Sequence, residues 1–403
     1  PPTPQPPNPP LEGLQRGGAI QKGRGPRGPG GMRAARPGPG PGPWPHDGGA
    51  ELPRGCGAAG AAALAVRLVP AWRGADAGAV RGEAVAGGLT NRLLRLSAGA
   101  GCPDLLLRLY EGDTDAFVDR ELEAAVLAQA RAAGLGAPIL ASFANGRFEL
   151  FLSAARTAAC EDMSRPPLLP GVPRLMRRVH EHVRPEGCRE PQQFARARRW
   201  LRECVELAEA AGGGNGAGEG GHDFGAWQAE VDWLEALCAQ EGSPVVFCHN
   251  DVHALNVMVG VEEEGVEEGG TRVQLIDFEY GSYGHRGFDV GNHFNEYCGF
   301  ECREELYPSE ELRRSFCACY LGADAPAEEV ERLLREAEVF SLASHLFWGL
   351  WGLLQSLLRR PPAAAATDFD YAGYARRRWA WFLRRKPAVL ARRAAAPPAG
   401  APA

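Results

Sequence analysis

Three polar side chains with a defined spacing could carry chemistry in this chain. Asp251 and Asn256 lie between two apolar runs in "VVFCHNDVHALNVMV", and Asp277 ends the next apolar run, "QLID". Phosphoryl transfer needs such a set, because one carboxylate orients the attacking hydroxyl while an Asn and a second Asp hold Mg²⁺ against nucleotide phosphates. Residues at strand ends have little freedom, and positioning with electrostatic stabilisation provides most of the rate enhancement in this chemistry.

Each of these residues also has a purely structural interpretation. Asp251 alone would be a turn or capping residue, since an Asp followed five residues later by an Asn is common by chance. Two upstream features favour the chemical interpretation: the turn "GGLTN" (87–91) offers backbone N–H groups to phosphates, and Arg108 places a charge inside an apolar run. Arg108 would otherwise face solvent from an edge strand. Glu121 or Glu123 in the next segment would pair with Arg108, and the sequence does not choose between them.

The elements that would position these residues begin with an antiparallel sheet. Apolar runs bounded by Gly and polar turns predict its strands, and Asn145-Gly146 between two of them is a strong hairpin signal. A helix is inserted in the sheet, with Asp119 favouring its first turn and Gly134 its end. Strands are expected within 84–99, 104–112 and 138–152, and helices over 60–72 and 115–134.

The second half of the chain predicts mainly helices, because its apolar residues recur at helical spacing. Short strands flank the two Asp residues, with the acidic loop "VEEEGVEEGG" between them. The Gly-rich stretch 211–221 reads as a flexible loop between two helices. Helices are expected over 174–183, 194–212, 226–240 and through 303–395, and strands over 244–251, 256–260 and 271–281.

Composition excludes several classes of protein. The chain has 403 residues, 45% of them hydrophobic, and a net charge of -6, so it has a core to bury and no basic footprint for nucleic acid. The 11 cysteines lack paired CxxC spacing, which favours reduced, mostly buried thiols over zinc ligands. Nothing resembles a signal peptide or an apolar run of about 18 residues, so no membrane span is expected. Residues 1–55 are rich in Pro, Gly and Arg and are expected to be disordered, with a transit peptide as the alternative.

Several motifs together resemble the choline/ethanolamine kinase family. They are "VVFCHNDVHALNVMVG", "QLIDFEYGSYGHRGFDVGNHFNEY", "GGLTNRLLRL", "LLLRLY" with "TDAFVDRELE", and "ASHLFWGLWGLLQS". The resemblance runs from about residue 80 to 385. It implies an α+β, bilobal, protein-kinase-like fold, with an N-terminal antiparallel sheet and one helix, and a larger, mainly helical C-terminal lobe. It also implies transfer of the ATP γ-phosphate to the hydroxyl of a small amino alcohol.

The resemblance also assigns roles to residues. It makes Asp251 the catalytic base and Asn256 and Asp277 the Mg²⁺ ligands. On the nucleotide side it implies Gly87, Gly88, Leu89, Thr90, Asn91, Arg92, Leu93, Arg108 and Glu123. On the substrate side it implies an ammonium pocket formed by Tyr280, Glu296, Trp348, Trp351, Phe369 and Tyr374.

The physics of the substrate side agrees with this assignment. A cation is attracted to aromatic faces and to a carboxylate. Trp348 and Trp351 are three residues apart and so share one helix face. Core packing is the alternative role for these two side chains.

Other polar residues near the motif are expected to organise it. His249 would hold the catalytic loop, and Asp289, with His293 and Arg286, would act on the same loop through hydrogen bonds. His253 lies in the variable middle of the motif and receives no role.

The motifs "DRELE", "TDAF", "GNHFNEY" and "LYPSEE" look most like ethanolamine kinases, including the plant type. The expected reaction is therefore phosphorylation of ethanolamine to phosphoethanolamine, the first step of the CDP-ethanolamine route to phosphatidylethanolamine. Choline and dual specificity remain alternatives, since the sequence supplies both aromatic rings and hydrogen-bond acceptors. A protein kinase, an aminoglycoside-type phosphotransferase and a non-catalytic kinase-like binding protein are the rival classes.

The expected organisation follows from these assignments. Residues 1–55 form a disordered tail, 56–155 the nucleotide-binding lobe, 156–390 the catalytic and substrate lobe, and 391–403 a second disordered tail. ATP and Mg²⁺ are the expected cofactors and the amino alcohol the expected partner, with no nucleic acid and no transmembrane segment. A cytoplasmic location is expected, and the resemblance is compatible with a homodimer.

Overall fold

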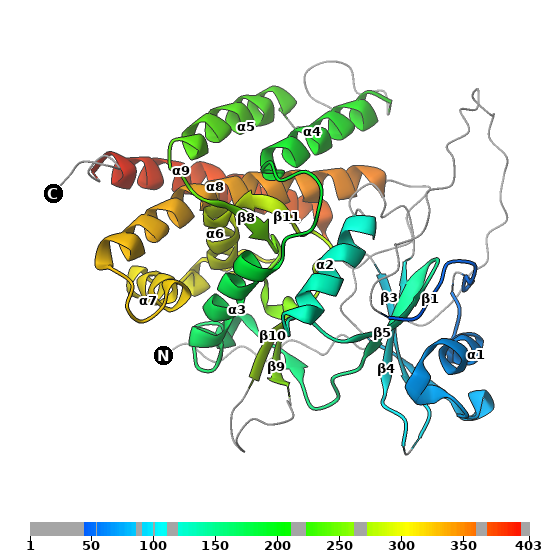
Figure 1. The fold of residues 1–403 in the computed structure, drawn as a ribbon. Helices are drawn as coiled ribbons and strands as arrows, with labels where there is room; N and C mark the ends of the chain where they lie inside the picture. Colours follow the sequence, from blue (N-terminus) through cyan, green and yellow to red (C-terminus); the bar gives the residue numbers. More distant parts are fainter. Residues whose placement is uncertain are drawn as a thin grey trace, which may run out of the picture. The chain divides into compact units, whose positions relative to one another are not determined.

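The computed structural model describes residues 44–53, 55–85, 91–99, 101–110, 120–210, 223–261, 272–359 and 369–395 (Figure 1). The nucleotide turn predicted at Gly87, Gly88, Leu89 and Thr90 lies outside these ranges.

The N-terminal part is built on a six-stranded sheet of order β1-β5-β6-β4-β3-β2. All neighbouring strands are antiparallel except β1 and β5, which are parallel. The apolar runs within 91–97, 105–110, 139–143 and 146–150 form strands as predicted, whereas β1 was not expected and β2 begins before the predicted run at 84. The elements are β1 (His46–Asp47), α1 (Ala58–Leu68), β2 (Arg81–Ala84), β3 (Asn91–Ser97), β4 (Leu105–Tyr110), α2 (Arg120–Ala132), β5 (Ile139–Phe143) and β6 (Gly146–Leu150).

The two faces of this sheet differ in character because side chains alternate along each strand. Leu105, Leu107 and Leu109 of β4 point into an apolar core that they share with α1. Arg108 and Tyr110 lie on the opposite face, which α2 covers (Figure 1). One strand thus supplies both the core of the lobe and a charged group beneath α2.

The hairpin between β5 and β6 forms as predicted, but its turn is shifted by one residue. Phe143 pairs with Gly146, so Ala144 and Asn145 form the turn instead of Asn145-Gly146. Gly146 is required for a different reason: a Cβ there would lie 2.5 Å from the backbone oxygen of Arg108. Asn145 uses its side chain to bind Leu52, accepting from the backbone N–H at 3.0 Å and donating to the carbonyl at 2.7 Å.

Residues 44–52 are ordered, so the predicted disordered tail of 1–55 extends too far. Trp44 donates its indole N–H to the Ser142 hydroxyl at 2.9 Å, and β1 pairs with β5 beside it. Leu52 is buried in the core under α1. The Pro and Gly content could not predict this order, because the segment is held by strand pairing with β5 and by the side chains of Trp44 and Leu52.

The C-terminal part is mainly helical, as predicted, with two small sheets of order β10-β9-β7 and β11-β8. β11 is short and contains Gly284, and it was not expected from the sequence. The helices are α3 (Leu168–His182), α4 (Gln193–Ala210), α5 (Phe224–Ala239), α6 (Arg286–Glu296), α7 (Glu310–Leu321), α8 (Ala327–Leu358) and α9 (Tyr371–Ala395). The strands are β7 (Arg156–Thr157), β8 (Val245–Cys248), β9 (Val257–Val261), β10 (Arg272–Leu275) and β11 (Ser282–His285).

The long helix α8 forms the centre of this part, and α6 and α9 pack along it (Figure 1). Its side chains from Glu336 to Gln355 are all buried. α9 continues to Ala395, five residues into the tail predicted from 391 onward, because Val389 still packs into the same core. Helix α8 therefore fixes the position of α6, which carries several residues of the site.

The cysteines are unpaired and mostly buried, as the sequence predicted. All 11 cysteines are free, and seven of them are buried. Within the described ranges, no helix combines the length and the apolar character that crossing a membrane requires.

A substitution at Gly291 tests how closely α6 packs on α8. A Cβ at this position would lie 2.4 Å from the Ala337 oxygen and 2.8 Å from the Ser341 nitrogen, both backbone atoms of α8. Gly291→Ala should therefore lower the free energy of unfolding by about 3 kcal/mol, since the helices must separate. Thermal denaturation measures this as a lower Tm. Gly225→Ala, in the exposed first turn of α5, is the matched control and should leave the Tm within about 2 °C; an equal loss in both variants would contradict the packing argument.

Candidate active site

The loop that follows β8, residues 249–256, carries the predicted catalytic residues and is called the catalytic loop here. It ends in a 3-10 turn, Ala254–Asn256, from which β9 begins. Asn250 adopts a φ of 67°, a left-handed conformation that Asn tolerates better than most residues. The loop therefore depends on groups that hold its backbone in place.

The fully buried carboxylate of Asp289, on α6, is the main such group. It accepts hydrogen bonds from the backbone N–H groups of His249 at 2.8 Å and Asn250 at 2.7 Å, and from His180 Nε2 at 2.9 Å. Burial alone would raise the pKa of Asp289, but its hydrogen bond and charge interaction with His180 lower it. The prediction that Asp289 organises the loop is confirmed. Cys248 lies close enough to His180 and Asp289 for the three side chains to hold a metal ion, but hydrogen bonds already engage both carboxylate oxygens of Asp289.

Two further histidines hold the loop as predicted. His249 accepts the Asp251 N–H at Nδ1 (3.3 Å) and donates from Nε2 to the Ile276 carbonyl at 3.0 Å. His293 binds the Val252 carbonyl through Nδ1 at 2.8 Å, and burial lowers its pKa to about 4, so the ring is a neutral donor.

Arg286 does not take part in this network, so its predicted role in the loop is wrong. Its guanidinium binds the carboxylate of Glu336 on α8, at 2.8 and 3.0 Å. The two residues lie on helices packed against each other, and this ion pair joins α6 to α8.

Asp251, Asn256 and Asp277 come together at the ends of β8, β9 and β10. Asn256 Nδ2 donates to the Asp251 carbonyl at 2.9 Å and to its Oδ2 at 3.0 Å, which turns Asn256 Oδ1 away from Asp251. The Asn256 carbonyl accepts the Ile276 N–H at 3.0 Å, and this places the residue before Asp277 beside Asn256. The sequence predicted this convergence from apolar runs that end in polar residues.

The oxygen atoms of Asn256 and Asp277 fit a hard divalent cation. Asp277 has a φ of 64°, and its buried Oδ1 has no hydrogen-bond partner among the residues that the structure describes. Its Oδ2 lies 3.2 Å from Arg108 NH1. Carboxylate and amide oxygens are the ligand types that Mg²⁺ accepts in proteins, and Asp277 and Asn256 supply one of each.

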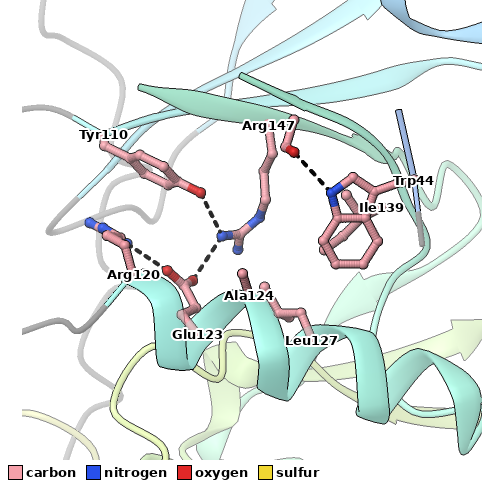
Figure 2. Close-up of a pocket in the computed structure, with 9 residues that line it drawn as sticks. Trp44, Tyr110, Arg120, Glu123, Ala124, Leu127, Ile139 and Arg147 are labelled. Carbon is pink, nitrogen blue, oxygen red and sulfur yellow. Dashed lines mark hydrogen bonds and ion pairs between the residues drawn. The ribbon is translucent and has the colours of Figure 1, made fainter. Parts of the chain in front are cut away.

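Arg108 is held by Glu149 and Asp277, not by Glu123 or Glu121, so the predicted pairing is wrong. Arg108 Nε donates to Glu149 Oε1 at 3.1 Å. Glu123 binds Arg147 NH1 at 2.8 Å instead, as Figure 2 shows, while Glu121 is exposed. Arg147 is the cross-strand partner of Arg108 on β6 and lies nearer to α2, so it takes the helix carboxylate.

The described residues of the predicted nucleotide segment divide between the two faces of the sheet. Asn91 and Leu93 lie on the charged face, where Asn91 Nδ2 donates to Glu279 Oε2 at 3.1 Å and Leu93 pairs with Arg108. Arg92 points to the other face and donates to the Cys56 carbonyl at 2.7 Å. Only the backbone of Arg92 is therefore on the side of the site.

Five predicted substrate residues form one aromatic cluster: Tyr280, Trp348, Trp351, Phe369 and Tyr374. Neighbouring rings meet edge to face, with centroid distances of 5.1 Å for Tyr280–Trp348, 5.6 Å for Trp348–Trp351 and 5.7 Å for Phe369–Tyr374. Phe300, which the sequence did not single out, extends the cluster at 5.3 Å from Phe369. The shared helix face predicted for the two Trp residues is confirmed.

Glu296 lies beside this cluster but is already in an ion pair. Its Oε1 accepts from Arg378 NH1 at 2.9 Å, and both side chains are almost fully buried. Arg378 also donates to the Ser344 hydroxyl at 2.7 Å and lies over the Tyr374 ring. Sequence reasoning missed Arg378 because it is one of three consecutive arginines in "YARRRW", and helical spacing alone does not show which one faces the core.

The aromatic cluster is hydrogen-bonded to the catalytic loop by two routes. Trp348 donates to Asn292 Oδ1 at 2.9 Å, and Asn292 Nδ2 donates to the Asn250 carbonyl at 3.0 Å. Trp351 donates to the Tyr280 hydroxyl at 3.0 Å, and the Tyr280 carbonyl accepts from Asn250 Nδ2 at 3.0 Å. Both routes end on the residue before Asp251.

His253 lies near both the Asp251 carboxylate and Phe300 of the aromatic cluster. Its Nδ1 accepts the Leu255 N–H at 3.2 Å, its Nε2 lies 3.6 Å from Asp251 Oδ2, and its ring is 5.5 Å from Phe300. Burial alone would lower the pKa of His253, but the Asp251 carboxylate raises it. The motif alone assigned no role to this residue, because it lies in the variable middle of the loop.

Comparison with known proteins decides the family. The family profile described as Choline/ethanolamine kinase matches residues 83–383. The chain belongs to the choline/ethanolamine kinase family. Among the relatives of this kinase, a probable ethanolamine kinase of Arabidopsis thaliana is 35% identical over 76% of this chain and 79% of its own length. A probable choline kinase of the same plant is 31% identical over 71% of this chain and 80% of its own length.

Solved structures confirm the predicted fold class for this kinase. An ethanolamine kinase of Plasmodium vivax superposes with a TM-score of 0.66 at 26% identity, covering 76% of this chain and 83% of its own. A choline kinase of Cryptosporidium parvum gives the same TM-score of 0.66 at 23% identity, covering 82% and 96%. The protein-kinase-like architecture, with an N-terminal sheet and a larger helical part, is thus shared.

The charge of Glu123 gives a pH-dependent prediction. Burial alone would raise its pKa, but Arg147 and Arg120 lower it from 4.5 to about 2. A carboxyl with a lowered folded pKa stabilises the fold above its unfolded pKa, and this contribution is lost as the pH falls toward the folded pKa. Glu123→Gln should therefore have a lower free energy of unfolding than the wild type at pH 7. This difference between variant and wild type should be about 1.4 kcal/mol smaller at pH 3.5.

Urea denaturation at the two pH values measures this difference. Glu121→Gln, on the exposed side of the same helix turn, is the matched control and should stay within about 0.5 kcal/mol of the wild type at both. A Glu123→Gln difference that does not change with pH would contradict the assignment.

Proposed function

We propose that this kinase transfers the γ-phosphate of ATP to the hydroxyl of ethanolamine, with Mg²⁺ as the metal. The observation that carries the proposal is the arrangement around Asp251. Its Oδ2 is held by Asn256, whose carbonyl accepts from the residue before Asp277. Asn250, the residue before Asp251, is bonded to the aromatic cluster from two directions. A phosphate site and a cation site thus meet at one carboxylate.

In this mechanism Asp251 accepts or orients the hydroxyl proton of the acceptor. Asn256 restrains one oxygen of Asp251 through its amide, so the carboxylate keeps a fixed direction while the other oxygen stays available. Asn256 Oδ1 and Asp277 would hold Mg²⁺, which supplies charge neutralisation at the phosphates when bound. Arg108, whose pKa is raised mainly because Asp277 and Glu149 outweigh its burial, stays cationic and faces the same phosphates.

Ethanolamine is the proposed acceptor, with choline or both as alternatives. A primary ammonium has three N–H donors and needs oxygen acceptors, whereas a quaternary ammonium relies on ring faces. Glu296 offers a carboxylate at the aromatic cluster, although Arg378 already binds one of its oxygens. Support for ethanolamine comes from the sequence motifs and from the 35% identical relative, a probable ethanolamine kinase. Phosphoethanolamine would then enter the CDP-ethanolamine route.

A turnover assay tests this proposal. The purified chain should consume ATP with ethanolamine, less efficiently with choline by kcat/KM, and not without an acceptor. Asp251→Asn should lower kcat by about 10²–10⁴-fold, because the proton acceptor is lost. Asp232→Asn, an exposed carboxylate paired with Arg198, is the control and should keep wild-type turnover. Turnover that needs no acceptor would sink the kinase assignment, and a preference for choline would overturn the choice of substrate.

Trp348 tests the substrate side separately. Trp348→Phe keeps a ring but removes the N–H that binds Asn292, and weakens the attraction of the ring for a cation. The KM for the acceptor should rise by about 10-fold while the KM for MgATP stays unchanged. Trp227 is buried in the same core with its ring against Trp379, so Trp227→Phe should lower the Tm without this split between the two KM values. Equal changes in both KM values for Trp348→Phe would count against the cation site.

A further inference from the structure

A chain of buried charges runs beneath α2 and ends at the proposed metal ligand Asp277. It consists of ion pairs between neighbouring residues on α2, β6, β4 and the loop after β10. This charge network is defined here as Arg120, Glu123, Arg147, Glu149, Arg108 and Asp277. Its inner members, Arg108, Glu123, Arg147 and Glu149, expose at most 9% of their side chains.

Glu149 occupies the centre of this network. Arg108 and Arg147 face each other as cross-strand partners on β4 and β6, and like charges in this position repel. Glu149 Oε1 accepts from Nε of both, at 3.1 Å from Arg108 and 2.6 Å from Arg147. One oxygen atom therefore offsets the repulsion and fixes the direction of both guanidinium groups.

The direction of Arg108 decides where its remaining N–H groups point. With Nε bound to Glu149, NH1 lies 3.2 Å from Asp277 Oδ2. Arg147 is held in turn by Glu123 at 2.8 Å and by the Tyr110 hydroxyl at 3.1 Å (Figure 2). Glu123 of α2 is thus linked to Arg108 through Arg147 and Glu149 of β6, by three consecutive ion pairs.

We propose that Glu149 is a positioning residue for nucleotide and metal binding. It holds Arg108 in the orientation that serves the phosphates and leaves Asp277 Oδ1 free for the cation. Glu149 itself touches neither Asp251 nor the aromatic cluster, and acts only through Arg108. This inference rests on the proposed function, because it assigns Arg108 to the phosphates and Asp277 to the metal.

Glu149→Gln tests the proposal, since it keeps an acceptor oxygen and the shape of the side chain but removes the charge between two arginines. Groups that orient a metal-binding residue typically change metal affinity or activity by 10–100-fold when mutated. The dissociation constant for a fluorescent ADP analogue with Mg²⁺, and the KM for MgATP, should both rise by about 10-fold. The KM for the acceptor should stay within about 2-fold. Glu149→Asp, which keeps the charge, should lose less.

A purely structural role for Glu149 predicts a different result. Asp104→Asn is the matched control, because Asp104 forms an ion pair with Arg95 of the same sheet and has no link to Asp277. Asp104→Asn should leave nucleotide binding unchanged, even where it lowers the Tm. If Glu149→Gln changes nucleotide binding by less than about 2-fold, or no more than Asp104→Asn does, the proposal is overturned.

Wild-type measurements separate this proposal from the proposed function. A chain that binds the ADP analogue with Mg²⁺ but phosphorylates neither ethanolamine nor choline would overturn the proposed function, and the effect of Glu149→Gln on binding would still decide the role of Glu149. A wild-type chain that binds no nucleotide would overturn both.

Discussion

The contact on which the rest of the site depends is that between the Asp289 carboxylate and two consecutive backbone N–H groups of the catalytic loop. A buried charge is costly unless it is fully bonded, and here the loop and His180 supply the donors. The loop in turn gains a fixed backbone at Asn250, whose left-handed conformation it could not keep unaided. Because Asp289 belongs to α6, the packing of α6 on α8 sets where Asp251 lies.

The site brings together two environments of opposite chemical character. On one side are the alternating arginines and carboxylates beneath α2, which suit phosphates and a metal ion. On the other is the aromatic cluster, which includes rings of α8 and α9, with the ion pair Glu296–Arg378 buried beside it. The catalytic loop contacts both, since Asn256 lies beside the strand that leads to Asp277 and Asn250 is bonded to Tyr280. Hydrogen bonds from this one loop therefore hold the two environments in fixed positions relative to each other.

Local pattern was enough to predict most elements and the residues with the strongest chemical signature. Asp251 and Asn256 lie between two apolar runs and Asp277 ends the next one, so their meeting at strand ends could be expected. Partners across the sheet could not be predicted: the sequence offers Arg108 several carboxylates, and only the register of β4 and β6 shows that Glu149 is the neighbour. Arg378 was missed for a similar reason, since its two neighbours are also arginines. The order of residues 44–52 depends on contacts with β5 and the hairpin, which composition does not record.

The bonds from Trp348 and Trp351 to Asn250 have a thermodynamic consequence. A molecule that binds to these rings and restrains them also restrains the backbone next to Asp251, through Asn292 and Tyr280. Coupling of this kind is reciprocal: under the proposed function, any factor by which a bound acceptor changes the affinity for the nucleotide is also the factor by which bound nucleotide changes the affinity for the acceptor. Substrate affinities in this enzyme are then properties of the pair of ligands, and the order of binding leaves the total free energy unchanged.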